Sequence, residues 1–167
     1  LSLTRLESGA SELQRQQFDL VELLATLVKD ADFEAKNRGC QVFFNSDGPV
    51  HFRGSEELLA RAAENVIRNA VKYTADNSSV SVELTQTEQN ICIRILDQGP
   101  GVPEAALDKL FEPFYRVADA RDRQSGGTGI GLAIADRSVR LHTGTIKAMN
   151  RSGGGLIVEI VLPSNVN

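Results

Sequence analysis

Apolar positions along the chain switch between helical and strand spacing, and this pattern predicts most of its elements. Over residues 20–37 apolar side chains recur three and four positions apart, which predicts a helix that Asp19 can cap. A second helix is predicted over residues 55–74, where the acidic first turn favours the positive end of the helix dipole. A third is predicted over residues 128–141, closed by Gly144.

Segments in which apolar and polar residues alternate predict the strands. Two of them, residues 80–85 and 91–96, are expected to form an antiparallel pair with one buried face. The other predicted strands are residues 41–45, 50–53, 145–149 and 156–162. Between residues 97 and 127 there is only a weak helical signal, over 104–110, and so long a connection in a compact domain is usually functional.

The first residues of the chain form a separate segment. Residues 1–10 are amphipathic but too short to be stable as an isolated helix, so they are either the end of a longer helix or a frayed tail. Residues 11–17 are polar and are interpreted as a linker. We therefore expect residues 1–16 to be the end of a preceding helix with its linker, and residues 17–167 to form one folded domain.

Composition narrows the class of protein. The chain has 167 residues, 41% hydrophobic and 24% charged, which suits a soluble globular domain with a core of its own. Its net charge of −4 leaves no basic surplus for a phosphate backbone, which argues against nucleic acid as a partner. Cys40 and Cys92 form no disulfide framework, which indicates a reducing compartment. Without a long apolar span or signal-peptide pattern, the chain is expected neither to cross nor to contact a membrane.

The second predicted helix carries an unusual polar stripe. With Asn65 set at zero on a helical wheel, Asn69 lies at about 40° and Lys72 at about −20°, away from the apolar face. Asparagine has poor helix propensity, so two asparagines one turn apart in a helix interior need an explanation. Amide oxygens are ligands that Mg²⁺ accepts, and an ammonium group can bind a phosphate oxygen. The alternative interpretation is a solvated polar face.

A glycine-containing segment, residues 97–101, follows one predicted strand. The carboxylate of Asp97 could accept a hydrogen bond from an exocyclic amino group such as that of adenine, while Gly99 and Gly101 permit close backbone approach and positive φ. The alternative is a simple turn after a strand.

A second glycine-rich segment, residues 126–132, precedes the third helix, whose free N–H groups could bind an anion. Its spacing matches neither a Walker A loop nor a Rossmann fingerprint, and a flexible hinge is the alternative. Between the two glycine segments, residues 111–116 contain three aromatic side chains. The nearby Arg116, Arg121 and Arg123 supply the local positive charge that an acidic chain needs to bind a polyanion. A loop anchored by phenylalanines, with solvated arginines, is the alternative here.

In order and spacing these segments resemble the four boxes of sensor histidine kinases: the N box, the G1 box, the F box and the G2 box, at residues 64–73, 97–101, 111–116 and 127–132. Residues 120–129 further resemble the Cpx-type envelope-stress kinases of bacteria. The resemblance implies the GHKL (Bergerat) fold. This is an α+β two-layer sandwich, with a mixed sheet of about five strands covered on one face by three helices, and a long ATP lid.

The resemblance also implies the cofactors, ATP and Mg²⁺, and the residues that would bind them. Asp97 would bind adenine, and Asn69 and Asn65 would ligate Mg²⁺. Asn65, Lys72 and Arg116 would be the catalytic residues. Arg121 and Arg123 lie in the more variable lid, and their roles stay open. The further nucleotide contacts that the resemblance implies are Tyr73, Gly99, Gly101, Phe114, Gly127, Thr128, Gly129, Ile130, Gly131 and Leu132.

The implied activity is transfer of the γ-phosphoryl group of ATP to a histidine on a dimerisation domain, and from there to a response regulator. The chain contains only His51 and His142, without the surroundings of a phospho-acceptor, and both are expected to be structural. Residues 1–9 resemble the end of the helix before this domain. We therefore interpret the chain as the cytoplasmic catalytic fragment of a kinase whose full length is expected in the bacterial inner membrane.

Two other functions remain possible from the sequence. The ATPases of type II topoisomerases, Hsp90 chaperones and MutL proteins resemble the same boxes but have a glutamate where Asn65 stands, as general base for water. An amide cannot accept that proton, which favours the kinase. The third possibility is a nucleotide-binding module without catalysis.

Overall fold

A computed structural model describes residues 13–115 and 131–164 of the chain. In chain order the elements of this part are β1 (Gln16–Asp19), α2 (Leu20–Ala35), the 3₁₀ helix η2 (Lys36–Arg38), β2 (Gln41–Ser46), β3 (His51–Gly54), α3 (Glu56–Tyr73), β4 (Ser79–Gln86), β5 (Asn90–Leu96), the 3₁₀ helix η3 (Glu104–Lys109), α5 (Gly131–Leu141), β6 (Thr145–Asn150) and β7 (Leu156–Pro163).

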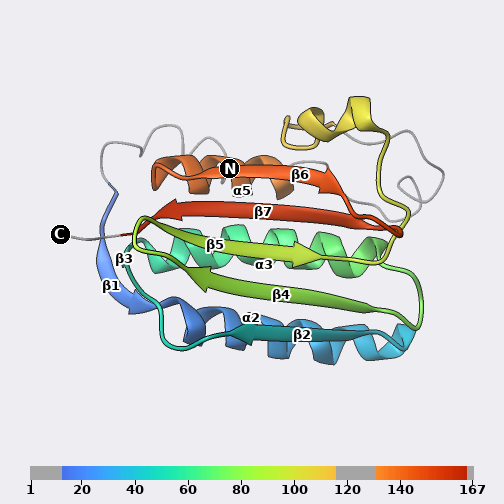
Figure 1. The fold of residues 1–167 in the computed structure, drawn as a ribbon, viewed down its shortest axis with the longest axis horizontal. Coiled ribbons are helices and arrows are strands. Elements are labelled where there is room, and N and C mark those ends of the chain that lie inside the picture. The colour runs from blue at the N-terminus through green and yellow to red at the C-terminus, as the bar shows by residue number, and fades with distance from the viewer. Residues whose placement is uncertain (1–12, 116–130, 165–167) are drawn as a thin grey trace.

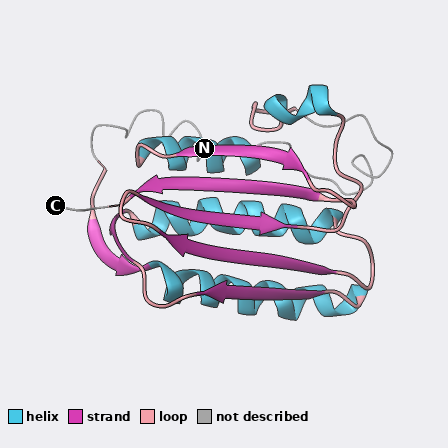
Figure 2. Cartoon of the chain, in the orientation of Figure 1, coloured by secondary structure: helices cyan, strands magenta, loops and turns pink. Residues whose placement is uncertain are grey.

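Five of the strands form one mixed sheet in the order β2-β4-β5-β7-β6. Strand β2 runs parallel to β4, and the other neighbours are antiparallel, including the predicted β4–β5 pair. Helices α2, α3 and α5 all lie on one face of this sheet (Figure 2). The two-layer α+β sandwich expected from the sequence is therefore confirmed.

The core is mainly aliphatic, as the scarcity of aromatic residues predicts, with Phe52 as its one fully buried aromatic side chain among the described residues. Alternate residues of β4 and β5 are buried, and so is one stripe of α3. Each fully buried valine, leucine or isoleucine of this set stabilises the fold by roughly 1.5–3 kcal/mol. Since a shift by one residue would turn these side chains to the other face, their burial fixes the strand register. They are Val80, Val82, Leu84, Ile91, Ile93 and Ile95 of the sheet, and Leu59, Ala62, Ala63, Val66, Ile67 and Ala70 of α3.

The starts of two helices are capped as the sequence indicates. The side chain of Asp19 accepts a hydrogen bond from Val21 N at 2.8 Å at the start of α2. At the start of α3, Ser55 Oγ accepts from Leu58 N at 3.2 Å. Each cap satisfies one of the backbone donors that a helix start leaves without an intrahelical partner.

The structure differs from the sequence prediction near the start of the domain. Residues 11–17 were expected to be a linker, but Gln16 and Gln17 belong to β1, which pairs antiparallel with β3 in a separate two-stranded sheet. The ring of Phe18 packs edge-on against Phe52, with centroids 6.1 Å apart. A strand with a single large apolar residue shows no alternation, so the periodicity could not reveal it. Residues 1–12, with the proposed end of a preceding helix, lie outside the described part.

Several chain ends meet at one end of the sheet, which positions the candidate site. Helix α3 and strand β5 both end on the right in Figure 1, next to the start of β7. The weak helical signal over residues 104–110 corresponds to η3, which lies near the same end. In residues 13–115 and 131–164, no helix is long and apolar enough to cross a membrane.

Candidate functional site

The C-terminal end of α3 and the end of β5 are bonded to each other. Gln98 N donates to Thr74 Oγ1 at 2.9 Å, and Ala75 N donates to Gln98 O at 3.2 Å. Thr74 is completely buried. A Cβ atom on Gly99 would overlap the carbonyl oxygen of Tyr73, so only glycine permits this approach. The helix that carries the asparagine stripe is thus held against the strand that ends at Asp97.

Asp97 is a buried carboxylate at this junction, with 4% of its surface exposed. Its Oδ1 accepts hydrogen bonds from Gly99 N at 2.9 Å and from Leu156 N at 3.0 Å. Within the described part of the chain both bonds go to Oδ1, so Oδ2 is the oxygen left to accept from a ligand. Burial raises the pKa of Asp97 above its ordinary value, while these two bonds and the charge of Arg151 oppose the rise.

The loop before β7 supplies contacts that the sequence analysis missed. A Cβ atom on Gly155 would overlap the carbonyl oxygen of Asp97, and φ at this glycine is +117°. Arg151 Nη1 donates to the same oxygen at 3.0 Å. This loop therefore fixes the backbone of Asp97 in addition to the contacts from the end of α3. The available signal was the run of three glycines at 153–155, each with positive φ in the structure.

Gly101 has the positive φ that the sequence allowed, at +71°. A Cβ atom there would come within 2.6 Å of Asn150 Oδ1. The amide of Asn150 accepts from Val102 N at 3.0 Å and donates to Val102 O at 2.7 Å, which ties this loop to the end of β6. Packing alone thus explains Gly99 and Gly101, and direct contact of either with a nucleotide stays a prediction.

The predicted stripe of Asn65, Asn69 and Lys72 lies on one continuous helix, and all three side chains are half-buried. A Cβ atom on Gly131 would lie 3.8 Å from the amide carbon of Asn65, so this amide faces the start of α5. Lys72 Nζ lies 5.1 Å from the centre of the Tyr73 ring, within cation–π range. The structure therefore brings the N box and the last residues of the G2 box together.

Two further predicted site residues, Phe114 and Leu132, lie in the described part of the chain. Phe114 has 72% of its surface exposed and a φ of +67°, and Leu132 is half-buried against the core. The remaining predicted residues lie outside the described part of the chain: Arg116, Arg121, Arg123, Gly127, Thr128, Gly129 and Ile130.

The oxygen donors of the site suit the expected metal, Mg²⁺. Residues 13–115 and 131–164 contain no group of three or more His, Cys, Asp or Glu side chains that could hold an ion. Mg²⁺ rarely needs such a group, because it keeps several waters and binds through one or two protein oxygens together with substrate phosphates. The half-buried amides of Asn65 and Asn69 fit that limited protein contribution.

The two histidines lie away from this site. His142 has 1% of its surface exposed, with Nδ1 donating to Ser138 O at 2.7 Å and Nε2 accepting from Ser55 N at 2.9 Å. Burial lowers its pKa below the ordinary 6.5. Both ring nitrogens are used within the fold, which supports the structural role expected of this residue. His51 is exposed on β3.

The fold is a two-layer α+β sandwich in which the polar stripe of α3 lies on the helix held against the buried carboxylate Asp97. The model of the family "Histidine kinase-, DNA gyrase B-, and HSP90-like ATPase" matches residues 54–166, from the start of α3 to the end of the last strand. The chain belongs to this family.

Similarity to individual proteins points to one branch of the family. The sensor histidine kinase CpxA of Escherichia coli K12 is 38% identical over 143 residues, which cover 85% of this chain and 31% of CpxA. The chain thus spans about a third of the length of the curated relatives it matches.

Solved structures share the fold. Full-length ShkA in complex with AMPPNP has a TM-score of 0.84 at 24% identity, covering 97% of this chain and 34% of ShkA. The histidine kinase ThkA in complex with the response regulator TrrA has a TM-score of 0.77 at 20% identity, covering 98% of this chain and 48% of ThkA.

Proposed function

We propose that this domain binds Mg–ATP and transfers the γ-phosphoryl group to a histidine on the dimerisation domain of the same two-component kinase. The observation that carries the proposal is Asp97, a buried carboxylate that accepts two hydrogen bonds at Oδ1 and, from residues 13–115 and 131–164, none at Oδ2. A ligand donor at Oδ2 would make a charge-assisted hydrogen bond, which is roughly twice as strong as a bond between neutral groups.

The position of Asp97 suits adenine. The exocyclic amino group of adenine is a donor that a carboxylate oxygen can accept, whereas guanine presents a carbonyl oxygen at the same ring position. A buried acceptor facing another acceptor is left unpaired, and sites of this kind discriminate strongly against the wrong ligand. The domain should therefore prefer ATP to GTP.

The phosphate end of the nucleotide would lie along α3. Asn69, with Asn65, would hold Mg²⁺, which when bound neutralises part of the phosphate charge. Lys72 places an ammonium group on the same stripe, and Arg116 would add a second positive charge. In phosphoryl transfer, positioning and charge neutralisation supply most of the catalysis.

Asn65 favours transfer to histidine over hydrolysis. Activation of water needs a general base, and a neutral amide cannot accept the proton. A histidine acceptor supplies its own nucleophilic nitrogen. Similarity to CpxA, named a sensor histidine kinase, supports the same choice.

The partners and the location follow as part of the proposal. ThkA is solved with a response regulator, and a response regulator is the proposed recipient of the phosphoryl group from this kinase as well. The whole protein would lie in the bacterial inner membrane, with this domain in the cytoplasm.

Two measurements test the proposal. The 167-residue chain is titrated with Mg–ATP and with Mg–GTP, and then mixed with Mg–ATP and the histidine-bearing domain of its kinase. We expect ATP to bind at least about tenfold more tightly than GTP and the added domain to become phosphorylated. Equal affinity for the two nucleotides would remove Asp97 from the site, and rapid hydrolysis of ATP by the chain alone would replace the kinase with an ATPase.

A further inference from the structure

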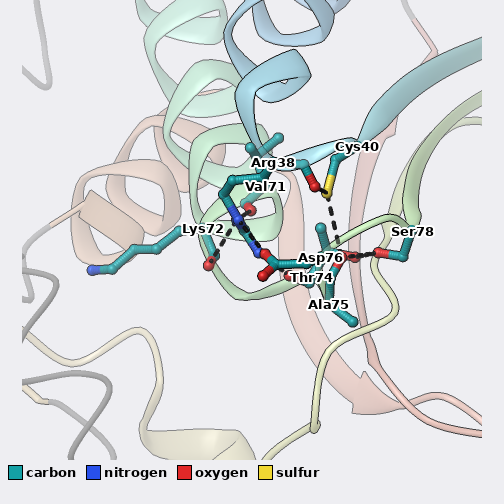
Figure 3. Close-up of polar contacts among 8 residues, drawn as sticks. All are labelled: Arg38, Cys40, Val71, Lys72, Thr74, Ala75, Asp76 and Ser78. Carbon is teal, nitrogen blue, oxygen red and sulfur yellow. Dashed lines mark hydrogen bonds and ion pairs between the residues drawn. The ribbon is translucent and has the colours of Figure 1, made fainter.

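The guanidinium group of Arg38 caps the C-terminal end of α3 (Figure 3). Arg38, at the end of η2, donates from Nη1 to Val71 O at 2.5 Å and to Lys72 O at 3.3 Å. Its Nη2 donates to Thr74 O, and its Nε pairs with Asp76 Oδ1 at 2.8 Å. The last carbonyl groups of a helix have no intrahelical partners, and here one side chain from another element satisfies three oxygens of this turn.

Arg38 is itself held in place by the backbone around it. Asn77 N donates to Arg38 O at 3.0 Å, and Cys40 Sγ donates to Ala75 O at 3.3 Å. Gly39 between them has a φ of +69°, and a Cβ atom there would overlap the side chain of Asn77. Residues 38–40 and 74–77 therefore form a fixed pair of segments at this end of the helix.

The same turn carries the groups that the proposed function assigns to the phosphates. In Figure 3 the side chain of Lys72 extends away from the Arg38 cluster, while its carbonyl group points into it. The turn is tied to Asp97 on its other side through Thr74 and Gln98. The positive charge of Arg38 also opposes the negative end of the α3 dipole, which would otherwise repel a nearby phosphate.

We infer that Arg38 is a positioning residue. It holds the last turn of α3 so that Lys72 and Asn69 keep a fixed place relative to Asp97, and thereby it raises affinity for the phosphate end of the nucleotide. This inference rests on the proposed function. Arg38 reaches the nucleotide only through the backbone of α3, so its loss should weaken binding of the phosphates and leave binding of the base nearly unchanged.

The experiment compares ATP with adenosine on the 167-residue chain, for wild type and the variants Arg38→Gln, Arg38→Lys and Asp76→Asn. Both affinities are measured well below the unfolding temperature of each variant. The ratio of the two affinities is the readout, because partial unfolding lowers both equally and leaves their ratio unchanged. We expect Arg38→Gln to weaken ATP about tenfold, since small misplacements of binding groups are costly, and adenosine less than about twofold.

The other two variants separate the causes. Arg38→Lys retains a charge that can reach part of the carbonyl cluster, so it should restore part of the lost ATP affinity. Asp76→Asn is the matched control, because the Asp76 side chain is 71% exposed and its ion pair can be removed while the carbonyl contacts remain. We expect it to keep the wild-type ratio.

The outcomes distinguish this inference from the proposed function. Absence of ATP binding by wild type would overturn both. ATP binding by wild type with an unchanged ratio in Arg38→Gln, or an equal loss for both ligands, would overturn the inference alone. A loss in Asp76→Asn as large as that in Arg38→Gln would do the same. Should Arg38→Gln fail to fold, Arg38→Lys decides: a lowered ATP affinity with unchanged adenosine affinity supports the inference, and wild-type affinity overturns it.

Discussion

A buried acid lies at one end of the sheet and a buried base at the other, and the two side chains differ in how completely the fold satisfies them. Asp97 follows β5 at one end, and His142 follows α5 at the other (Figure 1). His142 uses both ring nitrogens in bonds to Ser138 and Ser55. Asp97 receives both of its described bonds at Oδ1, and Oδ2 is left over.

This difference separates a structural group from a binding group. Burial alone cannot do so, because it disfavours the charged form of both and moves their pKa values in opposite directions: upward for the acid and downward for the base. A buried polar group with every partner inside the fold stabilises the fold. A buried polar group with an oxygen that the fold does not use can bind a ligand donor instead.

The largest expected effect comes from replacing Asp97, the proposed binding group. In Asp97→Asn the amide oxygen can still accept from Gly99 and Leu156, but an amide N–H₂ group takes the place of Oδ2 and faces the adenine amino group, donor against donor. We expect ATP affinity to fall about 100-fold or more. The free energy of unfolding without nucleotide should stay the same or rise, because the buried charge is removed. Calorimetric titration and chemical denaturation measure the two quantities.

A variant that bound ATP normally would show that Asp97 is structural like His142. A variant that lost both affinity and stability would show that the charge itself holds this end of the sheet together. Either result would remove the contrast between the two ends.

The second-largest effect is expected from replacing His142, the structural group at the other end of the sheet. His142→Phe keeps a ring beside Phe52, whose ring lies 5.9 Å away, but leaves Ser55 N without its acceptor. We expect a loss of about 2 kcal/mol in the free energy of unfolding. ATP affinity, measured at a temperature where the variant is folded, should be unchanged. A large loss of affinity would mean that the start of α3 positions the nucleotide as well.

How far the sequence predicted this contrast depends on the range of the interactions. Local periodicity placed α3 and the strand before Asp97 almost to the residue, because burial of one face fixes both. The stripe of Asn65, Asn69 and Lys72 also follows from helix geometry alone. The unused oxygen of Asp97 depends on Leu156, almost 60 residues away, and no local pattern encodes that bond.

Long-range contacts explain the other omissions too. Arg38 was unremarkable in the sequence, since its three carbonyl partners belong to a different helix. Strand β1 was missed because a short edge strand with one aromatic residue shows no alternation. The three glycines at 153–155 signal unusual backbone conformations, but the contact of Gly155 with Asp97 joins distant parts of the chain, and no local pattern encodes it.

A third prediction concerns Lys72, the proposed phosphate-binding residue on α3. Lys72→Met keeps an unbranched stem against the Tyr73 ring and removes the charge. We expect about a tenfold loss of ATP affinity with little change for adenosine, because a single ammonium group contributes roughly one such factor to phosphate binding. Arg68→Gln is the matched control. It removes one positive charge from the same helix, at a side chain that is 67% exposed. Equal losses in the two variants would assign the effect to net charge instead of position.

The smallest effect is the pH dependence, where the two ends should act with opposite sign. The lowered pKa of His142 means that its neutral form stabilises the fold above pH 6.5, and that this contribution is lost as pH falls toward the folded-state pKa. The raised pKa of Asp97 means that its contribution is present below its ordinary value of 3.8 and is lost as pH rises through the folded-state pKa. Acidification therefore destabilises through His142 and stabilises through Asp97.

Denaturant unfolding at pH 7.5 and pH 5.5 measures this for three chains. On acidification His142→Phe should lose the least stability and Asp97→Asn the most, with wild type between them, and contributions of all other groups cancel between the chains. The difference between wild type and His142→Phe cannot exceed about 1.4 kcal/mol for each pH unit below 6.5, since one group exchanges one proton. Parallel losses in all three chains would mean that neither buried group changes its proton affinity on folding, and the physical distinction between the two ends would then rest on hydrogen bonding alone.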